Sequence, residues 1–146
     1  MTNQRTWDIR FLEMAQLISS WSKDPSTRVG AVIVDQNHRI VSLGYNGFPY
    51  KVKDFPYRLE NREVKLQMTV HAELNAILFA NKSVEDCTLY IWPMQPCAKC
   101  ASIVIQAGIT RVVSPNASCR PEWKKSFDIA NEMFEEANVE ISYETI

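Results

Sequence analysis

Hydrophobic residues recur near the start of the chain at the spacing of an amphipathic helix. Trp7, Phe11, Met14, Ile18 and Trp21 are separated by four and three positions, which places them on one helical face. Such a stripe could be a binding face, but packing against a core is its far more common role. The Lys-Asp-Pro-Ser sequence that follows should end this helix, because proline disrupts helical hydrogen bonding.

Two hydrophobic runs come next and predict a β-hairpin. The first, VGAVIVD, covers residues 29–35, and the second, RIVSLGYNG, covers residues 39–47. The short polar sequence Gln-Asn-His between them is typical of a turn. We therefore expect two antiparallel strands, with His38 exposed to solvent at the tip of the turn.

Residues 47–68 show no clear hydrophobic period. They contain Pro49 and Pro56 among charges of both signs. We expect a long irregular loop here, and a loop of this length within a compact domain is often functional.

The rest of the chain alternates helical and strand patterns. Helices are predicted over residues 70–81, 96–107 and 122–138, and strands at TLYIWP, RVVS and VEISY. Gly108 follows the second of these helices at a position where glycine commonly ends a helix. Strand–helix–strand units imply parallel neighbours joined by right-handed crossovers. We expect a single α/β domain over residues 1–146, a three-layer α/β/α sandwich around a five-stranded mixed sheet.

Composition narrows the class of protein. The 146 residues are 46% hydrophobic and 23% charged, with a formal net charge of −1, as in soluble globular proteins. Without an overall basic charge, no nucleic-acid partner is expected. No apolar run reaches the roughly 18–20 residues that span a bilayer, and the amphipathic N-terminus lacks the apolar core of a secretory signal. We expect a cytoplasmic protein with no membrane association.

Two short motifs place metal-binding side chains at predicted helix starts. His71 lies in "HAE", and Cys97 and Cys100 lie in "PCAKC". Residues three apart share a helical face, so both sulfurs can reach one point. The positive end of a helix favours thiolates, as does a bound cation. If the two helix starts converge, they present one nitrogen and two sulfurs, a donor set suited to zinc.

The number of ligands predicts the kind of zinc site. No good fourth ligand is evident, since His38 lies in the hairpin turn and Cys87 and Cys119 have no partner motif. Structural zinc sites usually have four protein ligands, whereas catalytic sites leave one position open for a water that the metal acidifies. Glu73, two residues after His71, can then carry protons. Positions i and i+2 do not share a helical face, so Glu73 must reach the metal from the first turn.

Each motif also has a simpler explanation. A Cys-x-x-Cys pair can be redox-active or accidental, and a glutamate near a helix start is favourable in any helix. The combination H-x-E followed by P-C-x-x-C is far more specific, and it is the signature of zinc-dependent deaminases, with the glutamate as general acid and base. We expect an enzyme with one zinc ion per chain.

Longer stretches resemble a particular family. From about Trp7 to Val113, the chain is similar to deoxycytidylate (dCMP) deaminases of the cytidine deaminase superfamily in "WSKDPSTRVGAVIV", "GYNGFP", "HAELNAI", "PCAKCA" and "VIQAGI". The resemblance implies hydrolysis of dCMP to dUMP and ammonia. It also implies a homo-oligomer, often a hexamer, with dCTP as a possible activator and dTTP as a possible inhibitor.

The resemblance also implies roles for individual residues. The expected zinc ligands are His71, Cys97 and Cys100, and Glu73 is the expected proton carrier. Asn46 of "GYNG" matches an asparagine that contacts the substrate sugar, although a turn residue before glycine is the alternative.

Further substrate contacts are less specific. The backbone amide of Ala72 is expected to hold the pyrimidine. Lys23 and Arg28 are candidates for the 5′-phosphate, with the basic residues between Lys51 and Lys65 as a second source. For each of these cations, a solvated surface charge is the alternative.

Two departures from the family pattern matter. Some viral members carry a second zinc in the insertion after "GYNG", but residues 47–68 contain no Cys or His, so one zinc is expected. Trp92 and Pro93 replace part of an apolar-Thr-Leu run close to the metal and could reshape the base pocket. Alternative functions are therefore deamination of dCTP, CMP, tRNA adenosine, guanine or a riboflavin precursor. A non-catalytic zinc-binding module is a further alternative, which would need a fourth protein ligand.

Overall fold

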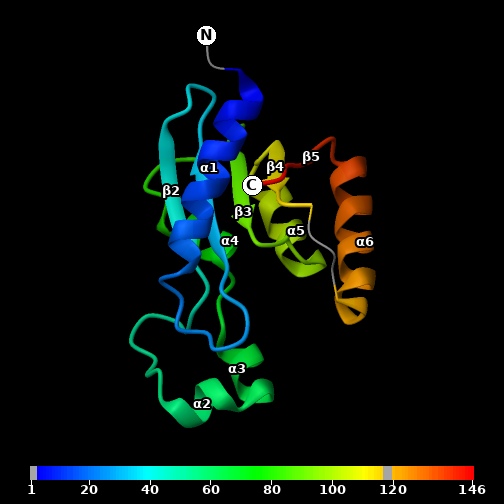
Figure 1. Cartoon of the computed structure of the whole chain (residues 1–146). Helices are drawn as coiled ribbons and strands as arrows, with labels where there is room; N and C mark the ends of the chain where they lie inside the picture. The colour runs from blue at the N-terminus through cyan, green and yellow to red at the C-terminus, as the bar shows by residue number, and fades with distance from the viewer. Residues whose placement is uncertain (1–2, 117–119) are drawn as a thin grey trace.

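The computed structural model describes residues 3–116 and 120–146. The strands of these segments form one five-stranded sheet (Figure 1). The strands lie in the order β2-β1-β3-β4-β5, and β1 is antiparallel to both of its neighbours, whereas β3, β4 and β5 are parallel. Their bounds are β1 Gly30–Val34, β2 Ile40–Tyr45, β3 Thr88–Trp92, β4 Arg111–Ser114 and β5 Glu140–Tyr143. The predicted hairpin and mixed sheet are confirmed.

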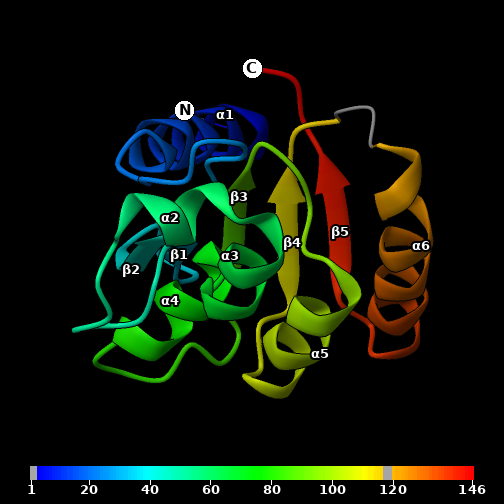
Figure 2. The same cartoon turned by 90° about the horizontal axis from the view of Figure 1, so that it is seen from below.

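Helices cover both faces of this sheet. Their bounds are α1 Gln4–Ser19, α2 Pro56–Glu60, α3 Arg62–Met68, α4 Ala72–Phe79, α5 Ala98–Gln106 and α6 Pro121–Glu136. Helix α1 packs on one face, and α4, α5 and α6 pack on the other (Figure 2). The predicted three-layer sandwich is confirmed. None of the helices within the described ranges is both long and apolar enough to cross a membrane.

The strand β1 shows how the two layers are built. All five of its residues are buried, as expected for a strand covered on both faces. Ala31 and Ile33 join the core under α4 and α5, whereas Val32 and Val34 join the core under α1. Alternate side chains of a strand point to opposite faces, so one apolar run serves both cores.

Two glycines allow helices to lie directly on the strands. A Cβ at Gly30 would stand 2.0 Å from the carbonyl oxygen of Ala15, and a Cβ at Gly44 would stand 2.5 Å from the amide nitrogen of Ala76. Both distances are too short for a Cβ, and the opposing atoms belong to helix backbone, which cannot move aside as a flexible side chain could. Gly44 therefore sets how closely α4 approaches β2, and with it the position of the residues at the start of α4.

Two expectations about local structure were wrong. Residues 47–68 are not an irregular loop, because they contain α2 and α3, which form a lobe below the sheet in Figure 1. Pro56 occupies the first turn of α2, and the side chain of Asn61 accepts the amide of Val64 to start α3. These helices are too short to show a helical period. His38 is not simply solvated, since its ring stacks on that of Trp7 with centroids 4.4 Å apart.

A buried charge pair connects α1 to the middle of the sheet. Asp8 accepts two hydrogen bonds of 2.8 Å from the guanidinium of Arg111, one of 2.7 Å from the hydroxyl of Tyr90, and one of 2.9 Å from the amide of Gln4. Burial alone would raise the pKa of Asp8, but these donors outweigh it and lower the pKa below its ordinary value of 3.8.

We expect Asp8→Asn to lower the free energy of unfolding at pH 7 by about 3 kcal/mol, because it leaves the guanidinium of Arg111 without its buried partner. A carboxylate with a lowered pKa stabilises the fold above its ordinary pKa, and this contribution is lost as the pH falls through the folded-state value. The difference in the free energy of unfolding between wild type and variant, measured by urea titration, should therefore shrink below about pH 4. Asp128→Asn, which breaks an exposed pair with Lys124, should cost less than about 1 kcal/mol; equal losses for the two variants would contradict the assignment.

Candidate active site

The start of helix α4 is held against the end of β2. His71 is the N-cap residue of α4, in an extended conformation, and the preceding Val70 exchanges two backbone hydrogen bonds with Gly47. One turn further, the side-chain amide of Asn75 donates to the carbonyl of Tyr45 at 2.8 Å. These contacts fix the direction in which His71 points.

The start of helix α5 lies next to the start of α4. Cys97 is the N-cap residue of α5, and Cys100 lies in its first turn with only 2% of its surface exposed. The cap has no side-chain hydrogen bond of its own. Instead, the hydroxyl of Ser126 on α6 accepts the free amide of Ala98 at 2.8 Å. A neighbouring helix thus supplies the missing cap and holds the cysteine-bearing turn in place.

The three predicted ligands converge. The ligand atoms of His71, Cys97 and Cys100 all lie within 4.8 Å of one another. His71 Nδ1 is 3.1 Å from the sulfur of Cys100 and 3.8 Å from that of Cys97. Tetrahedral zinc with ordinary bond lengths separates a nitrogen and a sulfur ligand by about 3.5 Å, so the donor set and its spacing both fit zinc. Among the described residues, no fourth histidine, cysteine or carboxylate completes this cluster.

The cluster is electrostatically prepared for a cation. Hydrogen bonds from Cys100 and His71 lower the pKa of the Cys97 thiol to about 4. The same contacts raise the pKa of His71 and, together with burial, that of Cys100. The thiolate of Cys97 is therefore favoured, whereas Cys100 keeps its proton. A bound cation would favour ionisation of both thiols.

Glu73 lies beside the cluster without belonging to it. It is 2% exposed, and burial raises its pKa to about 7 against the lowering effect of His71. Because His71 is the extended cap and not a helical residue, the rule that i and i+2 diverge does not apply, and Glu73 interacts with both His71 and Cys100. A buried carboxyl with a near-neutral pKa suits proton transfer in both directions.

A pocket of about 220 Å³ opens onto these residues. Segments far apart in the sequence supply its walls, namely the loop after α1, the end of β2, and helices α3, α4, α5 and α6. The lining residues include Asp24, Ser26, Thr27, Asn46, Arg62, Lys65, His71, Glu73, Cys97, Trp123, Ser126 and Phe127. Predominantly apolar clefts with a few convergent polar groups are typical of small-molecule sites.

The other expected substrate contacts are placed as follows. Asn46 lines the pocket and is 6% exposed. Its side chain is held by the backbone on both sides, since its amide donates to the carbonyl of Thr27 and its oxygen accepts the amide of Val29, each at 2.9 Å. Ala72 is fully buried between the pocket residues His71 and Glu73. A sugar contact by Asn46 and a base contact by Ala72 stay predictions.

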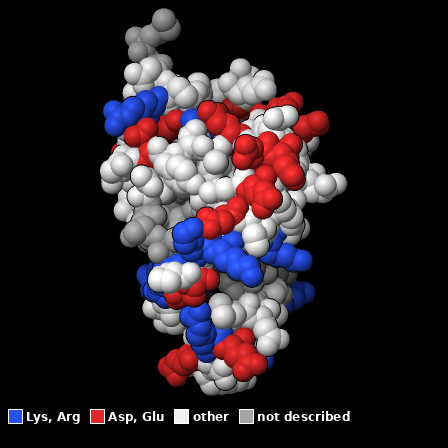
Figure 3. All heavy atoms as spheres, turned by 90° about the vertical axis from the view of Figure 1, so that its right-hand side faces the viewer, with Lys and Arg blue, Asp and Glu red and all other residues white. Residues whose placement is uncertain are grey.

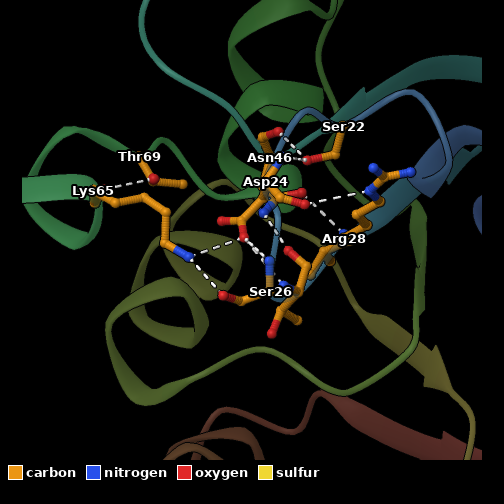
Figure 4. A network of polar contacts seen from close by, with 9 residues as sticks. Ser22, Asp24, Ser26, Arg28, Asn46, Lys65 and Thr69 are labelled. Atoms are coloured by element: carbon orange, nitrogen blue, oxygen red, sulfur yellow. Dashed lines mark hydrogen bonds and ion pairs between the residues drawn. The ribbon is translucent and has the colours of Figure 1, made fainter. Parts of the chain in front are cut away.

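The cations that the sequence favoured lie elsewhere. Lys23 pairs with Asp54 at 3.0 Å, and Arg28 donates to the carbonyl of Asp24; neither lines the pocket. Lys65, from the predicted second source, does line it and is 4% exposed. Figure 4 shows its ammonium directed at Asp24 and Ser26, at 3.0 and 3.1 Å.

Arg62, which also belongs to the predicted second source, stands three residues before Lys65 on α3 and likewise lines the pocket. Two aromatic residues of α6, Trp123 and Phe127, form a part of the pocket that the sequence did not predict, and both are only partly buried there. Nothing in their local pattern separates a core position from a pocket position on the same stripe.

Of the two remaining cysteines, Cys87 lies within the described structure and is not part of the cluster. Cys87 is buried with Val84 and Leu89 in the core under α4 and α5. Cys119 lies outside the described residues.

The sequence resembles known deaminases over most of its length. It is 44% identical over 139 residues to an uncharacterized deaminase in the luxG 3′ region of Aliivibrio fischeri, covering 94% of this chain and 92% of that one. It is 42% identical to the deoxycytidylate deaminase of Mus musculus, covering 73% of this chain and 63% of that protein. It likewise spans only 54% of the probable deoxycytidylate deaminase of Caenorhabditis elegans, at 46% identity.

The fold resembles that of a solved deaminase. The dCMP deaminase of the cyanophage S-TIM5, in complex with dCMP and dUMP, superposes with a TM-score of 0.77 at 22% identity, covering 98% of this chain and 100% of that one. The family model described as the cytidine and deoxycytidylate deaminase zinc-binding region matches residues 5–115. This segment carries the converging ligands and Glu73. The chain therefore belongs to the zinc-dependent cytidine and deoxycytidylate deaminase family.

Proposed function

We propose that the protein hydrolyses dCMP to dUMP and ammonia. The observation that carries this proposal is the buried Glu73 beside three converging zinc-type ligands, two of which, His71 and Cys97, line the same pocket as Glu73. Relatives at 42–46% identity are named deoxycytidylate deaminases, which supports dCMP over other pyrimidines. Zinc held by His71, Cys97 and Cys100 supplies the Lewis acidity that makes a water molecule nucleophilic at neutral pH.

The protein side chains then manage the protons. Glu73 accepts one proton of the water as its oxygen bonds to C4 of the cytosine ring, and it delivers that proton to the ring nitrogen N3. It then carries the second proton of the same water to the departing amino group. The C4–N bond breaks and ammonia leaves, so one water is consumed for each dUMP formed. Because Glu73 is almost fully buried, its proton passes to the substrate with little competition from solvent.

The direct test is an ammonia-release assay with dCMP, dCTP, CMP, deoxycytidine, adenosine and guanine. The proposal expects dCMP to have the highest kcat/KM. A preference for guanine or adenosine would replace it by another deaminase activity, and no turnover of any substrate by the zinc-loaded protein would favour a binding module.

The charge distribution on the α6 side of the molecule suits a small substrate. Basic side chains there form a short band with acidic side chains above and below it (Figure 3). Proteins that bind nucleic acids usually present a continuous basic surface along the phosphate path. This face offers none, which favours a mononucleotide over tRNA.

A 5′-phosphate would meet cations from α3. Lys65 and Arg62 both line the pocket, together with the hydroxyl-bearing Ser26 and Thr27. The ammonium of Lys65 is already paired with Asp24, whereas no ion pair joins Arg62 to any described residue. Arg62 is therefore the cation that gains most from a phosphate.

We expect Arg62→Met to reduce kcat/KM for dCMP roughly tenfold to hundredfold, because one charge-assisted hydrogen bond is lost. The value for deoxycytidine should not change, since it has no phosphate. Arg58→Met is the matched control, because Arg58 lies on the neighbouring helix α2 outside the pocket. A dCMP-specific loss in Lys23→Met or Arg28→Met, with none in Arg62→Met, would return the phosphate site to the residues first predicted.

We also propose that the protein is a cytoplasmic homo-oligomer. Helix α4 ends in Leu78 and Phe79, which are 71% and 70% exposed, and neighbouring large apolar side chains outside a core commonly mark an interface. The free thiols of Cys87, Cys97 and Cys100 suit a reducing compartment. Light scattering of the purified protein gives its oligomeric state, and a monomer would contradict the proposal. A hexamer and regulation by dCTP or dTTP stay predictions.

A further inference from the structure

Helix α6 carries one continuous stripe with two different surroundings. Trp123, Phe127, Ala130 and Phe134 follow at spacings of four, three and four, so they share a face. Ala130 and Phe134 are completely buried in the core. Trp123 and Phe127 are only partly buried, and both line the pocket that holds the zinc-type ligands.

The aromatic half of this stripe is held in a defined position. The Trp123 and Phe127 rings pack at 6.4 Å between centroids, and the guanidinium of Arg120 lies 4.9 Å from the Trp123 ring. Ser126 lies between Trp123 and Phe127 in the sequence, and its hydroxyl accepts a hydrogen bond from the amide of Ala98 at the start of α5. This hydrogen bond ties α6, which carries the two rings, to the start of α5, which carries Cys97 and Cys100. Figure 2 shows the two helices side by side.

The aromatic surface formed by Trp123 and Phe127 favours a ligand with an apolar face. Apolar area left partly open inside a pocket is stabilised when a flat apolar group covers it. The pocket also places polar groups from α3 and from the loop after α1 among its other lining residues. A molecule with a planar ring at one end and an anionic group at the other would satisfy both.

We infer that Trp123, supported by Phe127, forms the wall against which the pyrimidine ring of the substrate stacks, and that it is a specificity-determining residue of this enzyme. The inference rests on the proposed function for the identity of the ring. These residues lie outside the segment 5–115 that matches the family model, so the wall is contributed by this chain's own C-terminal region.

Two variants separate stacking from a merely structural role. Trp123→Ala removes the wall, whereas Trp123→Phe keeps an aromatic face but removes the indole. We expect Trp123→Ala to raise KM for dCMP and for deoxycytidine alike, by roughly tenfold, with a smaller change in kcat and unchanged zinc content. Trp123→Phe should keep a KM close to wild type. Ile129→Ala, at a 41% exposed position of the same helix, should leave all parameters unchanged.

Intrinsic fluorescence provides a readout that does not depend on turnover. Titration of the wild type with dUMP should quench the indole emission, because a base stacked on Trp123 contacts that fluorophore directly. The quenching should disappear in Trp123→Phe, although Trp7, Trp21 and Trp92 remain.

The outcomes distinguish this inference from the proposed function. If the wild type releases no ammonia from dCMP, the proposed function fails. If it does, unchanged KM in Trp123→Ala, a rise for dCMP alone, or undiminished quenching in Trp123→Phe would each overturn the stacking wall and leave the deaminase intact.

Discussion

Replacing Glu73 by alanine is expected to yield a folded, zinc-loaded protein that turns over dCMP at least about 10²–10⁴-fold more slowly than wild type, the usual contribution of general acid–base catalysis. Glu73 is the one carboxyl among the pocket residues that lies beside the ligand cluster, and no ligand atom is lost with it. Burial already raises its pKa to about 7, so removing it also removes a desolvated group. The melting temperature should therefore not fall.

The matched control for this variant is Glu122→Ala. Glu122 is also an acidic residue in the first turn of a helix, here α6, but it is exposed. If Glu73 only favoured the start of α4, both variants would lose a little stability and neither would lose activity. The measurements are kcat for dCMP, zinc by elemental analysis and the melting temperature. A near-normal kcat in Glu73→Ala, or loss of zinc from it, would refute the assigned role.

Removing any one of the three ligands is expected to abolish both zinc binding and activity. His71→Ala, Cys97→Ser and Cys100→Ser each leave two protein donors, too few to hold zinc against dilution. Zinc binds only the folded arrangement of α4 and α5, so its loss should also lower the melting temperature. A strong chelator should produce the same fall in the wild type, reversed by added zinc.

Cys87→Ala is the control for this series, because Cys87 is buried in the core away from the cluster. It should retain one zinc per chain and near-normal kcat. Elemental analysis that finds two zinc ions per wild-type chain, or loss of zinc in Cys87→Ala or Cys119→Ala, would contradict a site made of His71, Cys97 and Cys100.

The sheet and its long helices could be predicted because their patterns are local. The run from Val29 to Val34 is apolar throughout, and β1 is buried on both faces. Gly108 was expected to end a helix and has the positive φ of 92° that this position favours. The helices α2 and α3 were missed because five and seven residues are too few to display a period. Their starts depend on single residues, namely Pro56 in the first turn of α2 and the capping side chain of Asn61 in α3.

The ligand set could be predicted from the sequence, since Cys97 and Cys100 lie in the same turn at the start of α5 wherever that helix lies, and residue type restricts which metal they bind. The tertiary structure decided what surrounds that set. The ammonium of Lys65 donates to Asp24, 41 positions away in the sequence, and the amide of Ala98 donates to Ser126, 28 positions away. Such contacts depend on how α3 and α6 pack against the rest of the fold, and no local period or spacing records that packing. For this reason the chemistry of the site could be predicted from the motifs. Which of the basic residues between Lys51 and Lys65 line the pocket, and that Trp123 and Phe127 join them, could not.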